Sequence, residues 1–219
     1  EMIYNHITVK IPGNDEHFLI NPYGLHYSEV TASNLVKVDI AGNKIDNSPY
    51  AVNPAGMVIH SAIHAARPDM HCIAHTHTTE GMAVACSSEG LRTDNFYSAL
   101  LNNRIAYHDF EGITVMDDEK PRLVKSLADK NILILRNHGL LVSGRSIPEA
   151  FQTMWGLQRA CEVQVATDAS GKPNIPISDD VLAKTEQLLT LQAMGGPAGE
   201  LEFDALTRVI EKIDSSYKK

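Results

Sequence analysis

The stretch Cys72-Ile73-Ala74-His75-Thr76-His77 places two histidines at the end of a short apolar run. In an extended strand, residues two apart point to the same face, so His75 and His77 are expected to present their imidazoles side by side. This arrangement suits the binding of one transition-metal ion. A lone His-x-His pair is more often two hydrogen-bonded polar residues at a strand end, so a metal site needs a further ligand.

A third histidine follows the fully apolar run Leu133-Ile134-Leu135, in the segment Arg136-Asn137-His138-Gly139. We expect two strands within residues 132–142, joined by a turn at His138. Three imidazoles with one open position form the usual catalytic zinc site, in which water or substrate takes the vacant place. Neutral imidazoles without a thiolate suit Zn²⁺, and Mn²⁺, Fe²⁺ or Co²⁺ stay open as alternatives.

A well-marked helix is predicted just before the His-x-His stretch. Asn53 is expected to cap it, Pro54 suits its first turn, and Arg67-Pro68 ends it. His60 and His64 are four residues apart and therefore share a face of this helix. Such a pair can bind metal, but the favoured interpretation is polar residues that line a helix–sheet or subunit contact.

The other predicted elements alternate between strands and helices. Strands are predicted at 3–11, 18–20, 35–39, 105–107 and 113–115, and residues 132–142 are expected to form two more. Helices are predicted at 81–86, 95–101, 121–128, 146–165, 181–191 and 200–213. Residues 3–11 alternate apolar Ile7, Val9 and Ile11 with polar His6, Thr8 and Lys10, the pattern of a half-buried strand.

These elements predict an α/β protein, a single three-layer α/β/α domain with a mostly antiparallel central sheet. Residues 1–170 are expected to form the domain, and residues 171–219 a C-terminal helical arm of it. Ser170-Gly171-Lys172-Pro173 and a flexible break at Gly195-Gly196-Pro197 set this arm off.

Composition excludes several classes of protein. A chain of 219 residues with 43% hydrophobic content can bury one sizeable core. Its net charge of −8 argues against a nucleic-acid surface or an anionic membrane as the partner. Three widely spaced cysteines indicate no disulfide framework, and no apolar run is long enough to span a bilayer. We expect a soluble, cytoplasmic protein. Because the chain opens Glu1-Met2, we also expect its real beginning to be missing.

Several motifs in combination resemble the class II aldolase/adducin family. They are His60-Ser61-Ala62-Ile63-His64-Ala65-Ala66-Arg67-Pro68-Asp69, His75-Thr76-His77 and Asn137-His138-Gly139. Asn5-His6-Ile7, Asn21-Pro22-Tyr23-Gly24-Leu25 and Thr31-Ala32-Ser33 resemble its adducin-head branch in particular. The likeness runs from about Asn5 to about Ala166. It implies that His75, His77 and His138 hold a divalent metal, usually zinc, and that the protein is a homotetramer with active sites between subunits.

The resemblance implies a metal-dependent lyase that cleaves a carbon–carbon bond of a small oxygenated substrate, by aldol cleavage or decarboxylation through a metal-stabilised enediolate. The glutamate of the sugar-phosphate aldolases falls on Gly56, their phosphate-binding serines on Pro54 and Ala55, and their phosphate-loop threonine on Tyr23. These departures disfavour a sugar-phosphate substrate. The alternative is a non-catalytic, adducin-like binding or assembly module with a vestigial metal site; three retained imidazoles favour the enzyme.

Two residues are the leading candidates for the missing acid or base. Tyr97 falls near the tyrosine with which the aldolases reach into a neighbouring subunit's site, and Glu80 lies three residues past His77. The wider set of candidates also includes His60, Tyr107 and His108.

The candidate substrate-binding positions are Asn5, Tyr23, Gly24 and Gly56. Because Gly56 has no side chain, we expect open space beside the metal. The carboxylate of a small hydroxy or keto acid could lie there, close to the amide groups and dipole of the helix start.

Overall fold

The computed structural model describes residues 1–193 and 198–219. One sheet has the strand order β3-β2-β1-β4-β7-β6-β5. The strands are β1 (His6–Ile11), β2 (Asn14–Ile20), β3 (Val36–Asp39), β4 (Cys72–Thr76), β5 (Ile105–His108), β6 (Ile132–Leu135) and β7 (Gly139–Gly144). Only the β5–β6 pair is parallel, and the other neighbouring pairs are antiparallel. The predicted mostly antiparallel sheet is therefore confirmed.

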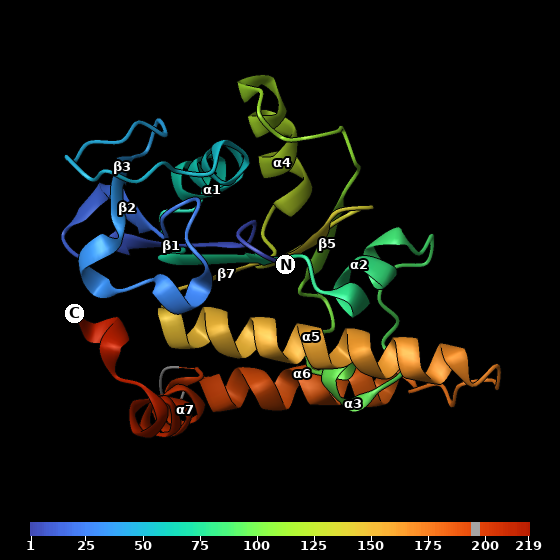
Figure 1. Ribbon diagram of the computed structural model, residues 1–219. Helices are drawn as coiled ribbons and strands as arrows, with labels where there is room; N and C mark the ends of the chain where they lie inside the picture. The colour runs from blue at the N-terminus through green and yellow to red at the C-terminus, as the bar shows by residue number, and fades with distance from the viewer. Residues whose placement is uncertain (194–197) are drawn as a thin grey trace.

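Helices cover both faces of the sheet. They are α1 (Pro54–Ala66), α2 (Thr79–Cys86), α3 (Phe96–Ala99), α4 (Lys120–Leu127), α5 (Ile147–Ala169), α6 (Asp179–Ala193) and α7 (Glu200–Ile213). Figure 1 shows α1 and α4 on one side of the sheet, and the long α5 crossing the other side with α3 and α6 beside it. This arrangement confirms the predicted α/β/α fold.

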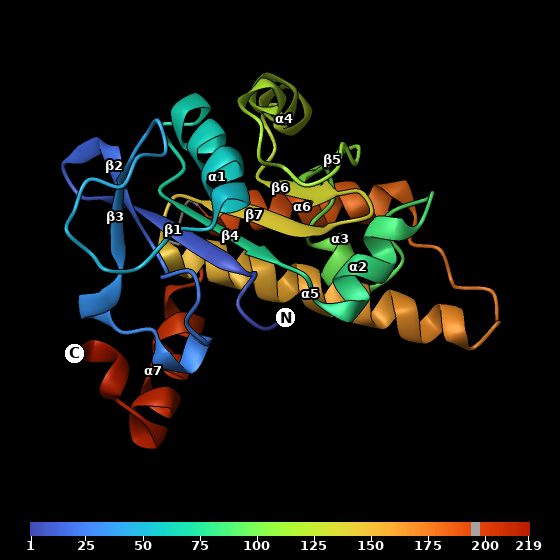
Figure 2. The same ribbon diagram turned by 45° about the horizontal axis from the view of Figure 1, so that its top comes forward.

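Strand β4 decides which side of the sheet carries the histidines. Its Cys72 and Ala74 belong to the buried cluster under α5, whereas Ile73 belongs to the cluster under α1 and α4. Since side chains alternate along a strand, His75 follows Ile73 onto the α1 side. Figure 2 shows α1 lying over β1 and β4 on that side.

Strand β1 reverses the burial expected from its alternating pattern. His6, Thr8 and Lys10 are 3%, 0% and 3% exposed, whereas Ile7 is 54% exposed. The polar side faces α1, whose own polar side chains supply hydrogen-bond partners to His6 and Thr8. A strand pattern gives the period of alternation, but the partner element decides which set of side chains is buried.

Two other expectations differ from the structure or lie outside it. The strand expected at 113–115 is wrong, because that segment is irregular and Ile113 is 83% exposed. Thr114 instead donates a hydrogen bond to Glu119 Oε1 at 3.1 Å. The break expected at Gly195-Gly196-Pro197 lies outside the described residues.

The C-terminal helices lie against the long helix of the domain. Phe203 of α7 packs edge-on against Phe151 of α5, with ring centroids 5.6 Å apart. Asn103 donates a hydrogen bond to Glu186 of α6 at 2.8 Å. The division of the chain near residue 170 stays a prediction. Within the described part of the chain, every helix is too short or too polar to cross a bilayer.

Candidate metal centre

The turn between β6 and β7 brings His138 to the end of β4. Leu135 pairs with Gly139 across the hairpin, and the His138 amide donates to the Leu135 carbonyl at 3.1 Å. Asn137 has φ = 58°, a left-handed conformation that asparagine tolerates better than most residues. The segment predicted as a turn is thus a tight connection between β6 and β7, and His138 is its last residue before β7.

Gly139 allows the close approach of β7 to the His-x-His stretch. A Cβ atom at this position would lie 2.4 Å from the Thr76 carbonyl oxygen and 3.2 Å from His77 Cδ2. Real Cβ contacts are not that short, so any larger residue would force the two strands apart. The geometry of the site therefore depends on a residue that carries no ligand atom.

The three histidines predicted as metal ligands meet at one point. The Nε2 atoms of His75 and His77 are 2.8 Å apart, and those of His138 and His77 are 2.9 Å apart. All three ligand atoms lie within 4.8 Å of one another. In a tetrahedral zinc site with Zn–N bonds of about 2.1 Å, ligand nitrogens are separated by roughly 3.4 Å. A small lengthening of the two contacts made by His77 would match that spacing.

The three Nε2 atoms of the triad cannot all be joined by hydrogen bonds, because neutral imidazoles carry too few protons at these positions. His75 Nδ1 donates to the Leu140 carbonyl at 2.8 Å, so the Nε2 of a neutral His75 is an unprotonated acceptor. A single Nε2 proton on His77 cannot serve both His75 and His138. Burial also lowers the pKa of His75 well below its ordinary value and that of His138 to about 4. The imidazoles are therefore neutral near pH 7, which is the form that binds metal.

A second histidine cluster lies directly beside the triad. His6 Nδ1 is 2.9 Å from His60 Nε2, and Thr8 Oγ1 is 2.7 Å from His60 Nδ1 and 2.9 Å from His64 Nε2. His64 Nδ1 then reaches the Met70 carbonyl at 3.3 Å. The prediction that His60 and His64 line a helix–sheet contact is confirmed. Burial lowers the pKa of His64 to about 3 and the pKa values of His6 and His60 well below their ordinary value.

The predicted substrate positions divide into two groups. Asn5 is next to the triad, because its Oδ1 accepts a hydrogen bond from the His77 amide at 3.2 Å. Gly56 is next to His6, which contacts the His75 ring with centroids 4.9 Å apart. Tyr23 instead pairs with Ala51, and the place of a side chain at Gly24 is open space. Roles in substrate binding stay predictions for all four.

The open space expected beside Gly56 is not present. A Cβ atom there would lie 2.9 Å from Cδ2 and 3.1 Å from Nε2 of His6. The imidazole of His6 fills the volume into which a side chain at Gly56 would extend. Our expectation of a vacant space for a substrate carboxylate is therefore wrong, because β1 buries the His6 ring against the start of α1.

The two candidate acid–base residues both face α5. The Tyr97 ring packs edge-on against Trp155 at 5.5 Å, and Gln158 donates to Glu80 Oε2 at 3.3 Å. Among the described residues, no hydrogen bond or ring contact joins either side chain to the triad. Catalytic roles for Tyr97 and Glu80 stay predictions. Tyr107 is engaged elsewhere, since its hydroxyl accepts the Leu91 amide hydrogen bond at 2.9 Å.

Sequence reasoning missed a carboxylate close to His138. Glu119 is 7% exposed and accepts hydrogen bonds from Thr114 and, at 3.3 Å, from His108 Nε2. A cavity of about 10 Å³, enough for one water-sized sphere, is lined by this group and by His138. Glu119 ends the acidic run Asp117-Asp118-Glu119, a pattern typical of a solvated helix start, so only its burial reveals it.

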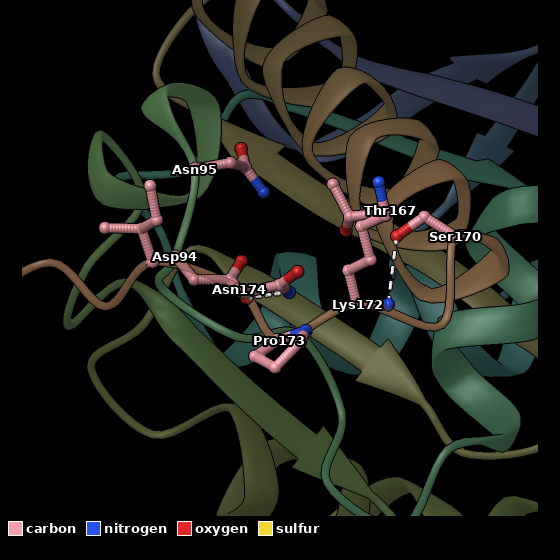
Figure 3. Close-up of a pocket in the computed structure, with 8 residues that line it drawn as sticks. Asp94, Asn95, Thr167, Ser170, Lys172, Pro173 and Asn174 are labelled. Carbon is pink, nitrogen blue, oxygen red and sulfur yellow. Dashed lines mark hydrogen bonds between the residues drawn. The ribbon is translucent and has the colours of Figure 1, made fainter.

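A larger cavity of about 330 Å³ lies where the end of α5 meets the segment before α3 (Figure 3). Its polar groups are partly paired among themselves, as Asn174 donates to Asp94 Oδ2 at 2.7 Å and the Lys172 amide to Ser170 Oγ at 3.2 Å. Asp94 also forms an ion pair with Arg92 at 2.9 Å. None of the lining residues is a histidine, so the triad remains the better candidate for chemistry.

Comparison with known proteins agrees with this fold. Residues 1–165 match the family described as the class II aldolase and adducin N-terminal domain. The chain therefore belongs to this family. An aldolase II superfamily protein from Pseudomonas syringae is 43% identical, with a TM-score of 0.93 over 100% of this chain and 88% of its own.

Two further relatives represent the two halves of the family name. An L-fuculose 1-phosphate aldolase from Glaciozyma antarctica is 32% identical, with a TM-score of 0.86 over 100% of this chain and 84% of its own. Alpha-adducin from Rattus norvegicus is 44% identical over 97% of this chain, which corresponds to 31% of the adducin. The family is thus established, while similarity alone does not choose between an enzyme and a binding module.

Proposed function

We propose that this protein is a divalent-metal-dependent lyase that cleaves a carbon–carbon bond in a small oxygenated substrate, as an aldehyde-lyase or a carboxy-lyase. The convergence of the three Nε2 atoms of His75, His77 and His138 carries the proposal. A module that only binds partners has no need for three neutral imidazoles directed at one point. The fold likeness to a fuculose-phosphate aldolase supports the same class of chemistry.

The chain's own residues prepare the site for such a reaction. The Leu140 carbonyl fixes the tautomer and orientation of His75, as a hydrogen-bond partner behind a metal ligand commonly does. Asn5 holds the backbone at His77. When bound, a divalent cation would supply Lewis-acid polarisation of a carbonyl group. Imidazole ligands suit Zn²⁺, with Mn²⁺, Fe²⁺ and Co²⁺ as alternatives.

We further propose a homotetramer, with Tyr97 reaching the site of a neighbouring subunit, and a cytoplasmic location. Two large apolar side chains are exposed: Phe96, the neighbour of Tyr97, is 71% exposed, and Ile113 is 83% exposed. Both could be covered by a neighbouring subunit, which supports interfaces at these two places. Light scattering at micromolar concentration tests the assembly. A monomer would contradict the tetramer and with it the role of Tyr97.

A panel of small hydroxy and keto acids, sugars and sugar phosphates tests the lyase. We expect metal-dependent binding of hydroxylated carbonyl compounds and very low cleavage of fuculose or rhamnulose phosphate. Titration calorimetry of metal-loaded protein, of chelator-treated protein and of His138→Ala makes the comparison. Binding that is equal in all three samples would contradict the lyase.

An adducin-like binding or assembly module is the second candidate. The 44% identity to alpha-adducin favours it, although this chain spans 31% of that protein. Under this alternative, removing the metal or replacing His138 by alanine leaves the oligomeric state unchanged, and no small molecule binds at the histidines.

A further inference from the structure

We propose that His6 is a substrate-binding residue whose unprotonated Nε2 atom accepts a hydrogen bond from a hydroxyl group of the substrate, beside the three metal-binding histidines. The inference rests on the proposed function and adds to it the contact that selects a hydroxylated substrate. Three observations lead to it: the direction of a buried hydrogen-bond chain, the availability of the Nε2 atom, and the position of the ring.

The direction of the chain is determined at its far end. The Met70 carbonyl can only accept, so His64 Nδ1 donates to it and a neutral His64 has an unprotonated Nε2. Thr8 therefore donates its hydroxyl proton to His64, and its oxygen accepts from His60 Nδ1. His60 Nε2 is then the acceptor for His6 Nδ1–H. The proton of a neutral His6 lies on Nδ1, and Nε2 keeps a lone pair.

The Nε2 atom of His6 is available to a ligand. It has no hydrogen-bond partner within the described part of the chain. Among the described residues, Arg159 Nε is the one side-chain nitrogen or oxygen that is both fully buried and without a hydrogen-bond partner. His6 Nε2 also has no partner, so it is not fully buried. It therefore reaches accessible space, although His6 as a whole is only 3% exposed.

The His6 ring lies beside one histidine of the triad, His75. It contacts the His75 ring with centroids 4.9 Å apart and an interplanar angle of 36°. It also fills the space next to Gly56, in the first turn of α1. A molecule held by the triad would therefore have His6 as a neighbour, and Nε2 is the polar atom that this ring can offer it.

The lone pair on Nε2 defines the chemistry of the group that it recognises. It accepts a hydrogen bond from a hydroxyl group, whereas a carboxylate or phosphate oxygen would place a second lone pair against it. The substrate class is therefore a small carbonyl compound with a neighbouring hydroxyl. This differs from the carboxylate that we expected at Gly56, and the buried chain accounts for the difference.

The tautomer can be tested without any ligand. Protein labelled with ¹⁵N-histidine is examined by long-range ¹H–¹⁵N correlation, with His6 assigned from the His6→Asn spectrum. We expect the signal of an unprotonated Nε2 and a protonated Nδ1 for His6. A proton on Nε2 overturns the proposal. Thr8→Val, which removes the hydroxyl between His60 and His64, should abolish the single tautomer, and Thr8→Ser should keep it.

Two variants of His6 separate the two nitrogens in a binding experiment. In His6→Asn the side-chain amide can still donate to His60 but offers nothing at the Nε2 position; His6→Gln keeps an oxygen acceptor near that position. The probes are lactate and its deoxy counterpart propionate, titrated into zinc-loaded protein. Losing one hydrogen bond corresponds to a fall of about fivefold to tenfold in the lactate-to-propionate affinity ratio for His6→Asn. We expect His6→Gln to keep most of the ratio and zinc content to stay at the wild-type level in both variants.

The outcomes distinguish failure of the role of His6 from failure of the proposed lyase. An unchanged ratio in His6→Asn overturns the role of His6 and leaves the lyase intact. Loss of zinc in His6→Asn also overturns it, because His6 would then serve the metal. A wild-type protein that holds zinc but binds neither probe overturns both claims. Should His6→Asn fail to fold, Gly56→Ala displaces the ring by a Cβ placed 2.9 Å from His6 Cδ2, and must lower the ratio as well.

Discussion

Two clusters of histidines lie on the same side of the sheet and touch through one ring contact, between His6 and His75. In the hydrogen-bond chain His6–His60–Thr8–His64, every hydrogen-bond donor has an acceptor. The direction of each bond follows from the Met70 carbonyl at the end of the chain, which can only accept. In the triad, three Nε2 atoms face one another with too few protons to pair. The same residue type thus forms a hydrogen-bonded polar core in one cluster and a candidate cation site in the other.

Proximity of histidines does not by itself indicate a metal site. What distinguishes the triad is that each ring directs the same atom to a common point, while the other nitrogen of His75 is held by a backbone carbonyl. Helical spacing alone, as in His60 and His64, produced a hydrogen-bonded contact. Changes that affect one cluster and spare the other therefore test this distinction.

The largest expected effect is on the triad. Gly139→Ala places a Cβ atom 2.4 Å from the Thr76 carbonyl and should separate β7 from the His-x-His stretch. We expect a loss of about 3 kcal/mol in the free energy of unfolding, together with weaker metal binding. Urea unfolding and metal content measure the two effects.

Gly156→Ala is the matched control for that substitution. Gly156 lies within α5, where an added Cβ meets nothing within 4 Å. Because alanine is the better helix former, we expect a gain of up to about 1 kcal/mol. Equal effects of the two alanines would show that the close approach at Gly139 does not hold the site together.

The next effect is on the buried chain. Thr8→Val removes the hydroxyl that joins His60 to His64 and keeps the shape of the side chain. It leaves two buried imidazole nitrogens unpaired, so we expect a loss of about 2 kcal/mol in the free energy of unfolding, with metal content unchanged. Thr8→Ser, which keeps the hydroxyl, should cost less in the same urea titration. A larger cost for serine than for valine would mean that the methyl group, and not the hydrogen bonds, matters at this position.

The smallest effect is a pH dependence of stability. Burial holds the pKa of His64 at about 3 in the folded protein, below the value of about 6.5 for an unfolded chain. As the pH falls below about 6.5, the unfolded chain takes up a proton that the folded protein does not, so stability present above that pH is lost. Between pH 7.5 and pH 5.5 this single group accounts for about 1.4 kcal/mol.

Urea unfolding of metal-free protein at the two pH values measures this loss. His64→Gln, which does not titrate, should remove about that much of the difference. The control Gly156→Ala changes no titrating group and should leave the difference as it is. If His64→Gln retains the full pH dependence, the chain is not the source of the acid sensitivity.

The sequence was sufficient for the strands that form the sheet, although it also indicated a false strand at 113–115, and for the helices on both faces and the three histidines that meet in the triad. Apolar runs locate β4 and β6, and the three histidines of the triad lie at or just beyond the ends of these strands. His6 and Glu119 could not be found in this way, because a polar side of a strand and an acidic run both indicate solvent. Burial of such residues depends on which distant element packs against them, and in β1 that element is α1. Family resemblance pointed to Gly56, but the ring that occupies its space comes from 50 residues earlier in the chain.

The central claim is that His75, His77 and His138 together hold one divalent ion, and metal analysis tests it most directly. Protein purified without chelator is compared with His138→Ala and with His60→Gln, a histidine of the neighbouring chain of hydrogen bonds. We predict about one divalent ion per chain for the wild type and for His60→Gln, and almost none for His138→Ala. Equal metal content in all three proteins, or none in the wild type after incubation with Zn²⁺, would contradict the account.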